Sequence, residues 1–217
     1  MSEPTQTRRP LVLHEPEVIR SLVARLQIAH LVTHHSERHV WALFMFLNGF
    51  ATIALLAAVA MVSGTPFVFP SLGPTAFLFF FTPRAPAASP RNTIYGHAIG
   101  ILCGYGALWL FGLQHAGPAM ATGVSAARVG AAALSLAATG ALMILSRAPH
   151  PPAGATTLII SLGIVTRPAH LLVIEVAVAL LALQAIAINR LAGLDYPLWS
   201  RPAPAASSAG QSRGPAR

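Results

Sequence analysis

The chain of 217 residues is 54% hydrophobic and only 9% charged, and its net charge of +8 comes from arginines without a single lysine. Typical soluble domains carry about 25% charged residues, so this composition excludes an ordinary soluble fold and predicts an all-α integral membrane protein. The arginines form no basic stripe with interleaved aromatics, which argues against nucleic acid as a partner. They are typical of residues that flank membrane spans and face anionic membrane lipid.

The polar N-terminal residues 1–40 are expected to form a cytoplasmic segment. Apolar residues between Glu15 and Ala29 recur at helical spacing, which predicts an amphipathic helix at the membrane surface. A histidine patch follows, but no carboxylate or cysteine cluster accompanies it, so we interpret it as a cap and predict no metal site. At the other end, residues 195–217 are rich in Pro, Ala, Ser, Gly and Arg, which predicts a disordered tail.

Four apolar segments are long enough to span a bilayer: residues 41–63, 94–113, 126–145 and 170–191. Two further segments, residues 66–82 and 147–163, are apolar but interrupted by proline and glycine. Proline cannot lie inside a regular helix, so each broken segment can hold only a short helix, over residues 75–82 and 155–162. We expect these two short helices to begin at membrane depth.

The second broken segment begins with His150-Pro151-Pro152 and continues through Gly154, Thr156 and Thr157. This motif resembles the signature of the HPP family of integral membrane proteins. A second matching block runs from Pro70 through Gly73, Pro74 and Thr75, and is followed by Pro90-Arg91-Asn92 and Gly96-His97. The resemblance implies one membrane domain over residues 41–194, usually counted as four helices, and nitrite transport as in some plastid and cyanobacterial members.

The two motif blocks superpose at an offset of 81 residues, which pairs Pro70 with Pro151, Gly73 with Gly154, and Thr75 with Thr156. Each half then consists of a span, a broken segment and a span, over residues 41–113 and 122–194. We therefore predict two tandem repeats, with four full transmembrane helices and two discontinuous half-helix segments.

The distribution of arginines predicts the topology. If the broken segments cross the membrane, six crossings place both termini, Arg84, Arg91 and Arg147 in the cytoplasm, with Arg128 and Arg167 outside. If those segments dip and return, most loop arginines lie outside, against the positive-inside rule. The first arrangement is favoured, and it makes the two repeats inverted.

In an inverted arrangement the two short helices meet N-terminus to N-terminus, where free N–H groups and the helix dipoles favour an anion. We expect Gly73 and Gly154 to permit close backbone approach there. His97 and Glu175 are candidates because they are ionisable groups within spans. The candidate substrate-binding residues are Pro70, Gly73, Pro74, Thr75, His97, Arg147, His150, Pro151, Pro152, Gly154, Thr156, Thr157 and Glu175.

These features predict a transporter or channel for a small inorganic anion, with nitrite first because of the resemblance. The alternative is a membrane scaffold or partner subunit without transport. No paired carboxylates, nucleophile triad or phosphate-binding loop indicates an enzyme, and no cofactor is expected. We expect the cell membrane as the location, and the Gly- and Ala-rich spans suit a homodimer.

Overall fold

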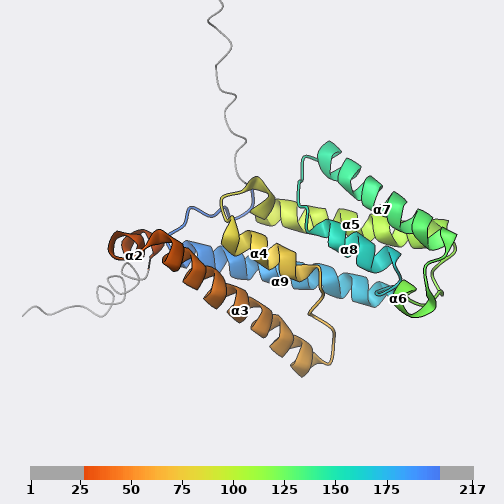
Figure 1. The fold of residues 1–217 in the computed structure, drawn as a ribbon, viewed down its shortest axis with the longest axis horizontal. Coiled ribbons are helices and arrows are strands. Elements are labelled where there is room, and N and C mark those ends of the chain that lie inside the picture. The colour runs from red at the N-terminus through yellow and green to blue at the C-terminus, as the bar shows by residue number, and fades with distance from the viewer. Residues whose placement is uncertain (1–26, 201–217) are drawn as a thin grey trace, which may run out of the picture.

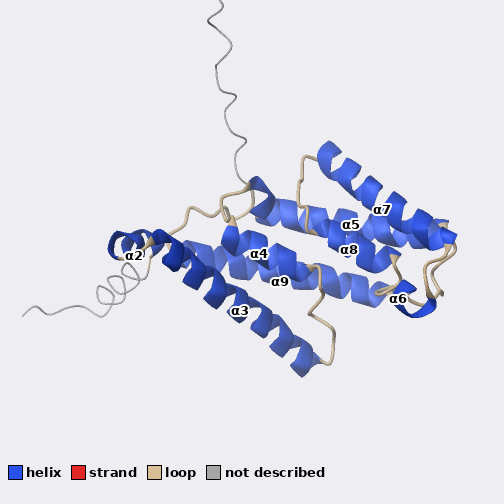
Figure 2. Ribbon diagram, in the orientation of Figure 1, coloured by secondary structure: helices blue, strands red, loops and turns tan. Residues whose placement is uncertain are grey.

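The computed structural model describes residues 27–200 of the chain, and every regular element within that range is helical. Figures 1 and 2 show long helices lying side by side, with shorter helices between them. Four helices are long and apolar enough to cross a bilayer: α3 (Glu37–Ser63), α5 (Pro90–Leu110), α7 (Ala126–Leu145) and α9 (Pro168–Leu191). The prediction of an all-α protein with four full spans is confirmed. Most of the amphipathic helix and of the tail that we predicted lies outside the described residues.

The shorter helices are α2 (Ile28–His34), α4 (Leu72–Phe81), α6 (Ala119–Thr122), α8 (Ala153–Ser161) and a 3-10 turn, η1 (Pro86–Ala88). Helices α4 and α8 fall in the two broken segments, and each begins two or three residues earlier than the sequence predicted. The reason is that proline is tolerated in the first turn of a helix, where its missing N–H has no partner to lose. Pro74 therefore lies inside α4, and Pro152 directly precedes α8.

One end of the helix bundle, which we call the Arg91 end, gathers the N-termini of α3 and α5 with the C-termini of α4, α7 and α9. Arg91 on α5 donates to the carbonyl of Arg147 after α7, at 3.0 Å. Asn189 near the end of α9 donates to the carbonyl of Phe79 in the last turns of α4, at 3.2 Å. These bonds connect helices that are far apart in sequence and fix their ends relative to one another.

The opposite end, the Arg128 end, holds the start of α7 and the C-terminus of α8. Arg128 is only 2% exposed, and its guanidinium donates to the carbonyls of Ser161 at 3.0 Å and Gly117 at 2.8 Å. The guanidinium lies against Gly163, whose φ of +81° suits glycine. A cation at a helix C-terminus is stabilised by the dipole and by the free carbonyls. Arg128 thus holds the end of α8 in place and does not project from the surface.

The two short helices begin close together and run toward opposite ends of the bundle. Thr75 in the first turn of α4 lies 3.2 Å from His150, three residues before α8. From this point α4 runs to the Arg91 end, where Phe79 meets α9, and α8 runs to the Arg128 end, where Ser161 meets α7. Figure 1 shows the two helices pointing in opposite directions beside α5 and α9.

A stripe of glycines on α5 sets the distance between α5 and α8. A Cβ added at Gly96 would come within 2.6 Å of the His150 Cβ, and one added at Gly100 within 2.8 Å of the Ala153 carbonyl oxygen. At Gly104 it would come within 2.8 Å of the Thr157 carbonyl oxygen. Residues four apart lie on one helix face, so the stripe brings the two backbones into direct contact.

The expected close approach at Gly73 is wrong, because a Cβ added there meets no heavy atom within 4 Å. At Gly154 the nearest atom would be the side-chain Cδ1 of Leu136 at 3.3 Å, and no backbone atom lies close. Glycines do permit a close helix contact, as predicted, but not at Gly73 or Gly154. The glycines whose small size permits the contact between α5 and α8 belong to α5.

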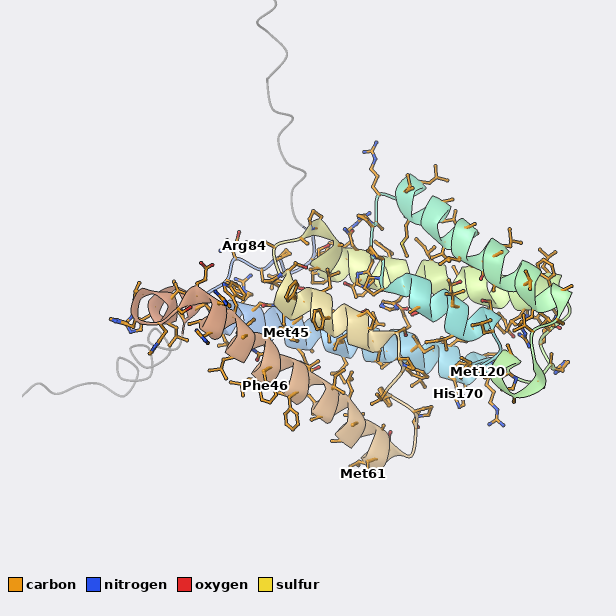
Figure 3. The ribbon with its side chains drawn as sticks, viewed as in Figure 1. Met45, Phe46, Met61, Arg84, Met120 and His170 are labelled. Atoms are coloured by element: carbon orange, nitrogen blue, oxygen red, sulfur yellow. The ribbon has the colours of Figure 1, made fainter. Side chains whose placement is uncertain are left out.

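Large apolar side chains remain exposed along the outer helices, most clearly on α3, where Phe46 is 69% and Met61 79% exposed. In Figure 3 Phe46 points away from the rest of the bundle, and Met61 lies at the far tip of α3. Lipid is as apolar as such side chains, so no exposure to water is implied for a helix in a bilayer. Figure 3 also places Arg84 and His170 toward opposite ends of the molecule.

Replacing Gly100 with alanine should destabilise the fold, because the new Cβ would collide with the Ala153 carbonyl. Overpacking of this kind costs about 1–3 kcal/mol. Gly106→Ala is the matched control on the same helix, since its Cβ would meet nothing within 4 Å. Thermal unfolding followed by circular dichroism in detergent should give a lower midpoint for Gly100→Ala alone. Equal midpoints for both variants would contradict the close contact of α5 and α8.

Replacing Arg128 with methionine should also destabilise the protein, because the buried Ser161 carbonyl would lose its guanidinium donor and the Gly117 carbonyl would keep only the 3.5 Å bond from Thr122. Each unsatisfied buried acceptor costs about 1–3 kcal/mol. Arg167→Met is the control, since Arg167 is exposed at the start of α9. The same melting experiment compares the two variants, and an unchanged midpoint for Arg128→Met would show that the guanidinium does not support α8.

Candidate functional site

The candidate site lies where the first turns of α4 and α8 reach the middle of α5. Thr75 is the fourth residue of α4, Thr156 is the fourth residue of α8, and His97 lies two turns into α5. All three are fully buried. The sequence proposed each of them separately, and the structure brings them together.

His97 is bonded on both sides of its ring. Its Nε2 lies 2.9 Å from the Thr75 hydroxyl, and its Nδ1 lies 2.7 Å from the Thr156 hydroxyl. Both distances are those of good hydrogen bonds. One imidazole on α5 therefore connects the two short helices, and neither ring nitrogen is left without a partner.

His150 extends this arrangement toward the Arg91 end. Its Nε2 lies 3.2 Å from the same Thr75 hydroxyl, while its Nδ1 donates to the carbonyl of Ala87 at 2.8 Å. The Thr93 hydroxyl lies 3.3 Å from that Nδ1 and itself donates to the Ser89 carbonyl at 3.0 Å. His150 is fully buried, and its ring centroid is 4.9 Å from that of His97. The two histidines thus form one buried cluster with the threonines.

A cavity of about 670 Å³ lies beside this cluster. Four of the predicted site residues line it, namely Gly73, Pro74, Pro151 and Pro152. Ala87, whose carbonyl accepts from His150, lines it as well. The remaining lining residues are Phe77, Leu78, Phe81, Thr82 and Ala155, so the wall is mostly apolar. The prolines shape the cavity, and the polar groups lie behind them.

The expectation of free N–H groups at the start of α8 is wrong. The amides of Ala153, Gly154 and Ala155 donate to the carbonyls three residues before them, at 2.9–3.0 Å. The residues before α8 form a tight turn that already satisfies these donors, as commonly happens at helix ends. A ligand at this point would meet hydroxyls and imidazoles, and the positive helix end would act on it without direct amide bonds.

Three predicted residues lie apart from the cluster. Arg147 is exposed, and its backbone carbonyl accepts a hydrogen bond from Arg91. Its φ of +51° turns the chain away from the axis of α7 before Pro149. Both carboxylate oxygens of Glu175 are buried on α9 and have no hydrogen-bond partner. Pro70 is exposed just before α4.

Three buried hydroxyls near the cluster have no partner: those of Ser71, Thr157 and Ser161. Only Thr157 was predicted from the sequence. Ser71 precedes α4 directly, and its carbonyl accepts from Thr75 at 3.3 Å. Thr157 and Ser161 are one turn apart on α8 and lead from the cluster toward Arg128. A threonine one turn from a histidine on an apolar helix is the signal that would have found Thr93, and a serine one turn from a motif threonine is the signal that would have found Ser161.

Between residues 27 and 200 the structure holds no group of three or more His, Cys, Asp or Glu side chains placed to bind a metal ion. The cluster of His97 and His150 is completed by hydroxyls, which are poor metal ligands beside imidazole. Its chemistry is that of hydrogen bonding and proton exchange.

Comparison with known proteins agrees with the membrane assignment. A transmembrane protein of Dictyostelium discoideum is 32% identical over 120 residues, which cover 55% of this chain and 35% of that relative. The matched part is thus about a third of the relative's length. No solved structure matches the chain.

The family model for the HPP transmembrane region matches residues 34–197, which include all four long helices and both short ones. This match confirms the family predicted from the two motif blocks, and its bounds extend the predicted domain by a few residues on each side. The chain belongs to the HPP family of integral membrane proteins.

Proposed function

We propose that this protein carries a small inorganic anion across the membrane, with nitrite as the first candidate. The observation that supports this most strongly is the bonding of Thr75 and Thr156, from two short helices, to the two ring nitrogens of His97. A buried polar cluster inside an apolar bundle is costly and is a functional site by default in a membrane protein.

The electrostatics of the cluster favour an anion over a cation. Two helix N-termini converge there, and each carries a partial charge of about +0.5. Within residues 27–200 no acidic side chain hydrogen-bonds to the cluster, and both oxygens of the buried Glu175 carboxyl are without a hydrogen-bond partner. The unpartnered hydroxyls of Ser71 and Thr157 are available donors for the oxygens of an anion. Nitrite, with two acceptor oxygens and one negative charge, has the chemistry for such donors.

The chain also carries the marks of an inverted repeat, and we propose that α4 and α8 are the half-helices of its two halves. Ala153 begins α8 81 positions after Leu72 begins α4, and Leu191 ends α9 81 positions after Leu110 ends α5. This is the offset that pairs Thr75 with Thr156 in the sequence. Transporters built from such repeats place the substrate where the broken helices meet.

The Arg91 end is the cytoplasmic end in this proposal, and the membrane is the cell membrane. Arg84, Arg91, Arg147 and Arg190 lie in or beside the helix termini gathered there, whereas Arg128 and Arg167 lie at the opposite end. The positive-inside rule assigns the richer end to the cytoplasm. Both described ends of the chain, α2 and the segment after α9, then lie on the cytoplasmic side, because the Ile28 amide donates to the Ala192 carbonyl.

Transport is tested by nitrite uptake into proteoliposomes that contain only this protein. Wild type should accumulate nitrite well above empty vesicles, and Thr156→Val should reduce the initial rate at least about fivefold, since a buried acceptor that loses its donor costs about 1–3 kcal/mol. Thr52→Val is the control, because Thr52 is equally buried but lies on α3 without a bond to the cluster. Wild-type uptake no greater than that of empty vesicles would favour a membrane scaffold or partner subunit instead.

The orientation is tested by single cysteines at Arg84, Arg147 and Arg167 in a Cys103→Ser background. An impermeant thiol reagent added to intact cells should label the cysteine at position 167 and leave those at 84 and 147 unmodified. Permeabilised cells should show all three labelled, which controls for access. Labelling at 84 or 147 from outside would contradict the proposed orientation.

A further inference from the structure

The hydrogen bonds of the cluster form one continuous chain of four side chains that ends on a backbone carbonyl. In order it runs from Thr156 to His97, Thr75 and His150, and then to the carbonyl of Ala87, with successive distances of 2.7, 2.9, 3.2 and 2.8 Å. The chain passes from α8 through α5 and α4 to the loop that lines the cavity. Hydroxyls and imidazoles are the groups that can pass a proton on by accepting one and releasing another.

The Ala87 carbonyl determines which way every bond in this chain points. A carbonyl can only accept, so the Nδ1 of His150 carries a proton and its Nε2, in the neutral ring, accepts. The Thr93 hydroxyl agrees with this tautomer, because it spends its own proton on Ser89 and can only accept from Nδ1. The donor to Nε2 of His150 is therefore the hydroxyl of Thr75.

The same reasoning carries through to the other end. Because the Thr75 proton points to His150, the oxygen of Thr75 accepts from Nε2 of His97. Nδ1 of His97 is then bare and accepts from the Thr156 hydroxyl. This is the arrangement in which both neutral histidines have every ring nitrogen satisfied. All its donors point from Thr156 toward His150 and the cavity.

We propose that Thr75 relays a proton from His97 to His150, which makes the anion transport proposed above dependent on a pH gradient. When Thr156 takes up a proton from a hydronium ion, which leaves as water, its original proton passes to Nδ1 of His97, and the Nε2–H bond of His97 breaks as a new O–H bond forms on Thr75. The original Thr75 O–H bond breaks as a new N–H bond forms at Nε2 of His150. The positive charge thus moves from His97 to His150, and no other atom changes its bonding.

A third acceptor lies within reach of Thr75. Its hydroxyl is 3.3 Å from the Ser71 carbonyl, so after the transfer it can turn there while Nε2 of His150 donates to its oxygen. The Thr75 hydroxyl can therefore form hydrogen bonds with three defined groups, namely two imidazoles and one carbonyl. The proton transfer itself does not depend on the proposed function. Only its coupling to the transport of an anion rests on that function.

Among residues 27–200, the side chains that hydrogen-bond to the two histidines are all threonines. Thr75 comes from α4, Thr156 from α8 and Thr93 from α5. Arg91, on the same helix as His97, is engaged with Asn92 and the Arg147 carbonyl, and Glu175 has no hydrogen-bond partner. No third titratable side chain in this part of the protein is hydrogen-bonded to the two histidines.

The direction of the chain is tested without any assumption about the substrate. Nitrogen-15 NMR of histidine-labelled protein in lipid bilayers distinguishes protonated from bare ring nitrogens, and His97→Gln and His150→Gln assign the signals. Wild type should show the proton of His97 on Nε2 and that of His150 on Nδ1. In Thr75→Val the proton of His97 should shift to Nδ1, toward Thr156, while His150 stays unchanged. A wild-type His97 protonated on Nδ1 would overturn the relay.

The transport arm uses the same variants in proteoliposomes with nitrite and an imposed pH gradient. Thr75→Val should lose gradient-driven accumulation, so that the inside-to-outside nitrite ratio at steady state falls to one whatever the rate of flux. His150→Gln should behave likewise, and Thr75→Ser, which retains the hydroxyl, should restore accumulation. Equal gradient dependence in wild type and Thr75→Val would overturn the relay. If wild type carries no nitrite, the proposed function fails, and the NMR result still decides the relay.

Discussion

The arrangement of this protein depends on the contact between the backbones of α5 and α8. Three glycines at intervals of four residues remove every side chain from one face of α5, and the His150–Ile160 region packs directly against that face. Inside a membrane the helices gain little from leaving lipid, so close packing and hydrogen bonds between helices must hold them together. Because α8 approaches so closely, a histidine next to Gly96 reaches the first turn of α8 on one side and of α4 on the other.

The polar cluster can be buried without a large free-energy cost only because its side chains hydrogen-bond to one another. An unpaired polar group in a hydrocarbon environment costs several kcal/mol, and the cluster leaves no histidine nitrogen without a partner. The hydroxyls of Ser71, Thr157 and Ser161 are different, since they are buried and unpartnered. Such groups in a native structure call for an explanation. Ser71 directly precedes α4, whereas Thr157 and Ser161 lie one turn apart on α8.

Much of this architecture could be predicted from the sequence, because length, apolarity and proline act locally. The spans, the two breaks and the pairing of Thr75 with Thr156 follow from such signals. The rotation of each helix about its own axis cannot be predicted from these local signals. Helices that are apolar all round show no periodic stripe to indicate the inward face, so His97 could not be ranked above Glu175, nor Gly100 above Gly73. Arg147 was chosen for its nearness to the motif, yet its backbone turns the guanidinium outward.

The burial of Arg128 has a consequence for how the chain is made. Its guanidinium bonds to Gly117, which precedes it in the chain, and to Ser161, which follows it by 33 residues. Synthesis proceeds from the N-terminus, so α7 enters the membrane while the second of these acceptors does not yet exist. An arginine costs about 2.5–3.5 kcal/mol at the centre of a bilayer and less near its edge. Helix α7 therefore gains the second carbonyl partner of Arg128 only after α8 has been synthesised, so the first turn of α7 reaches its final set of hydrogen bonds later than the rest of that helix.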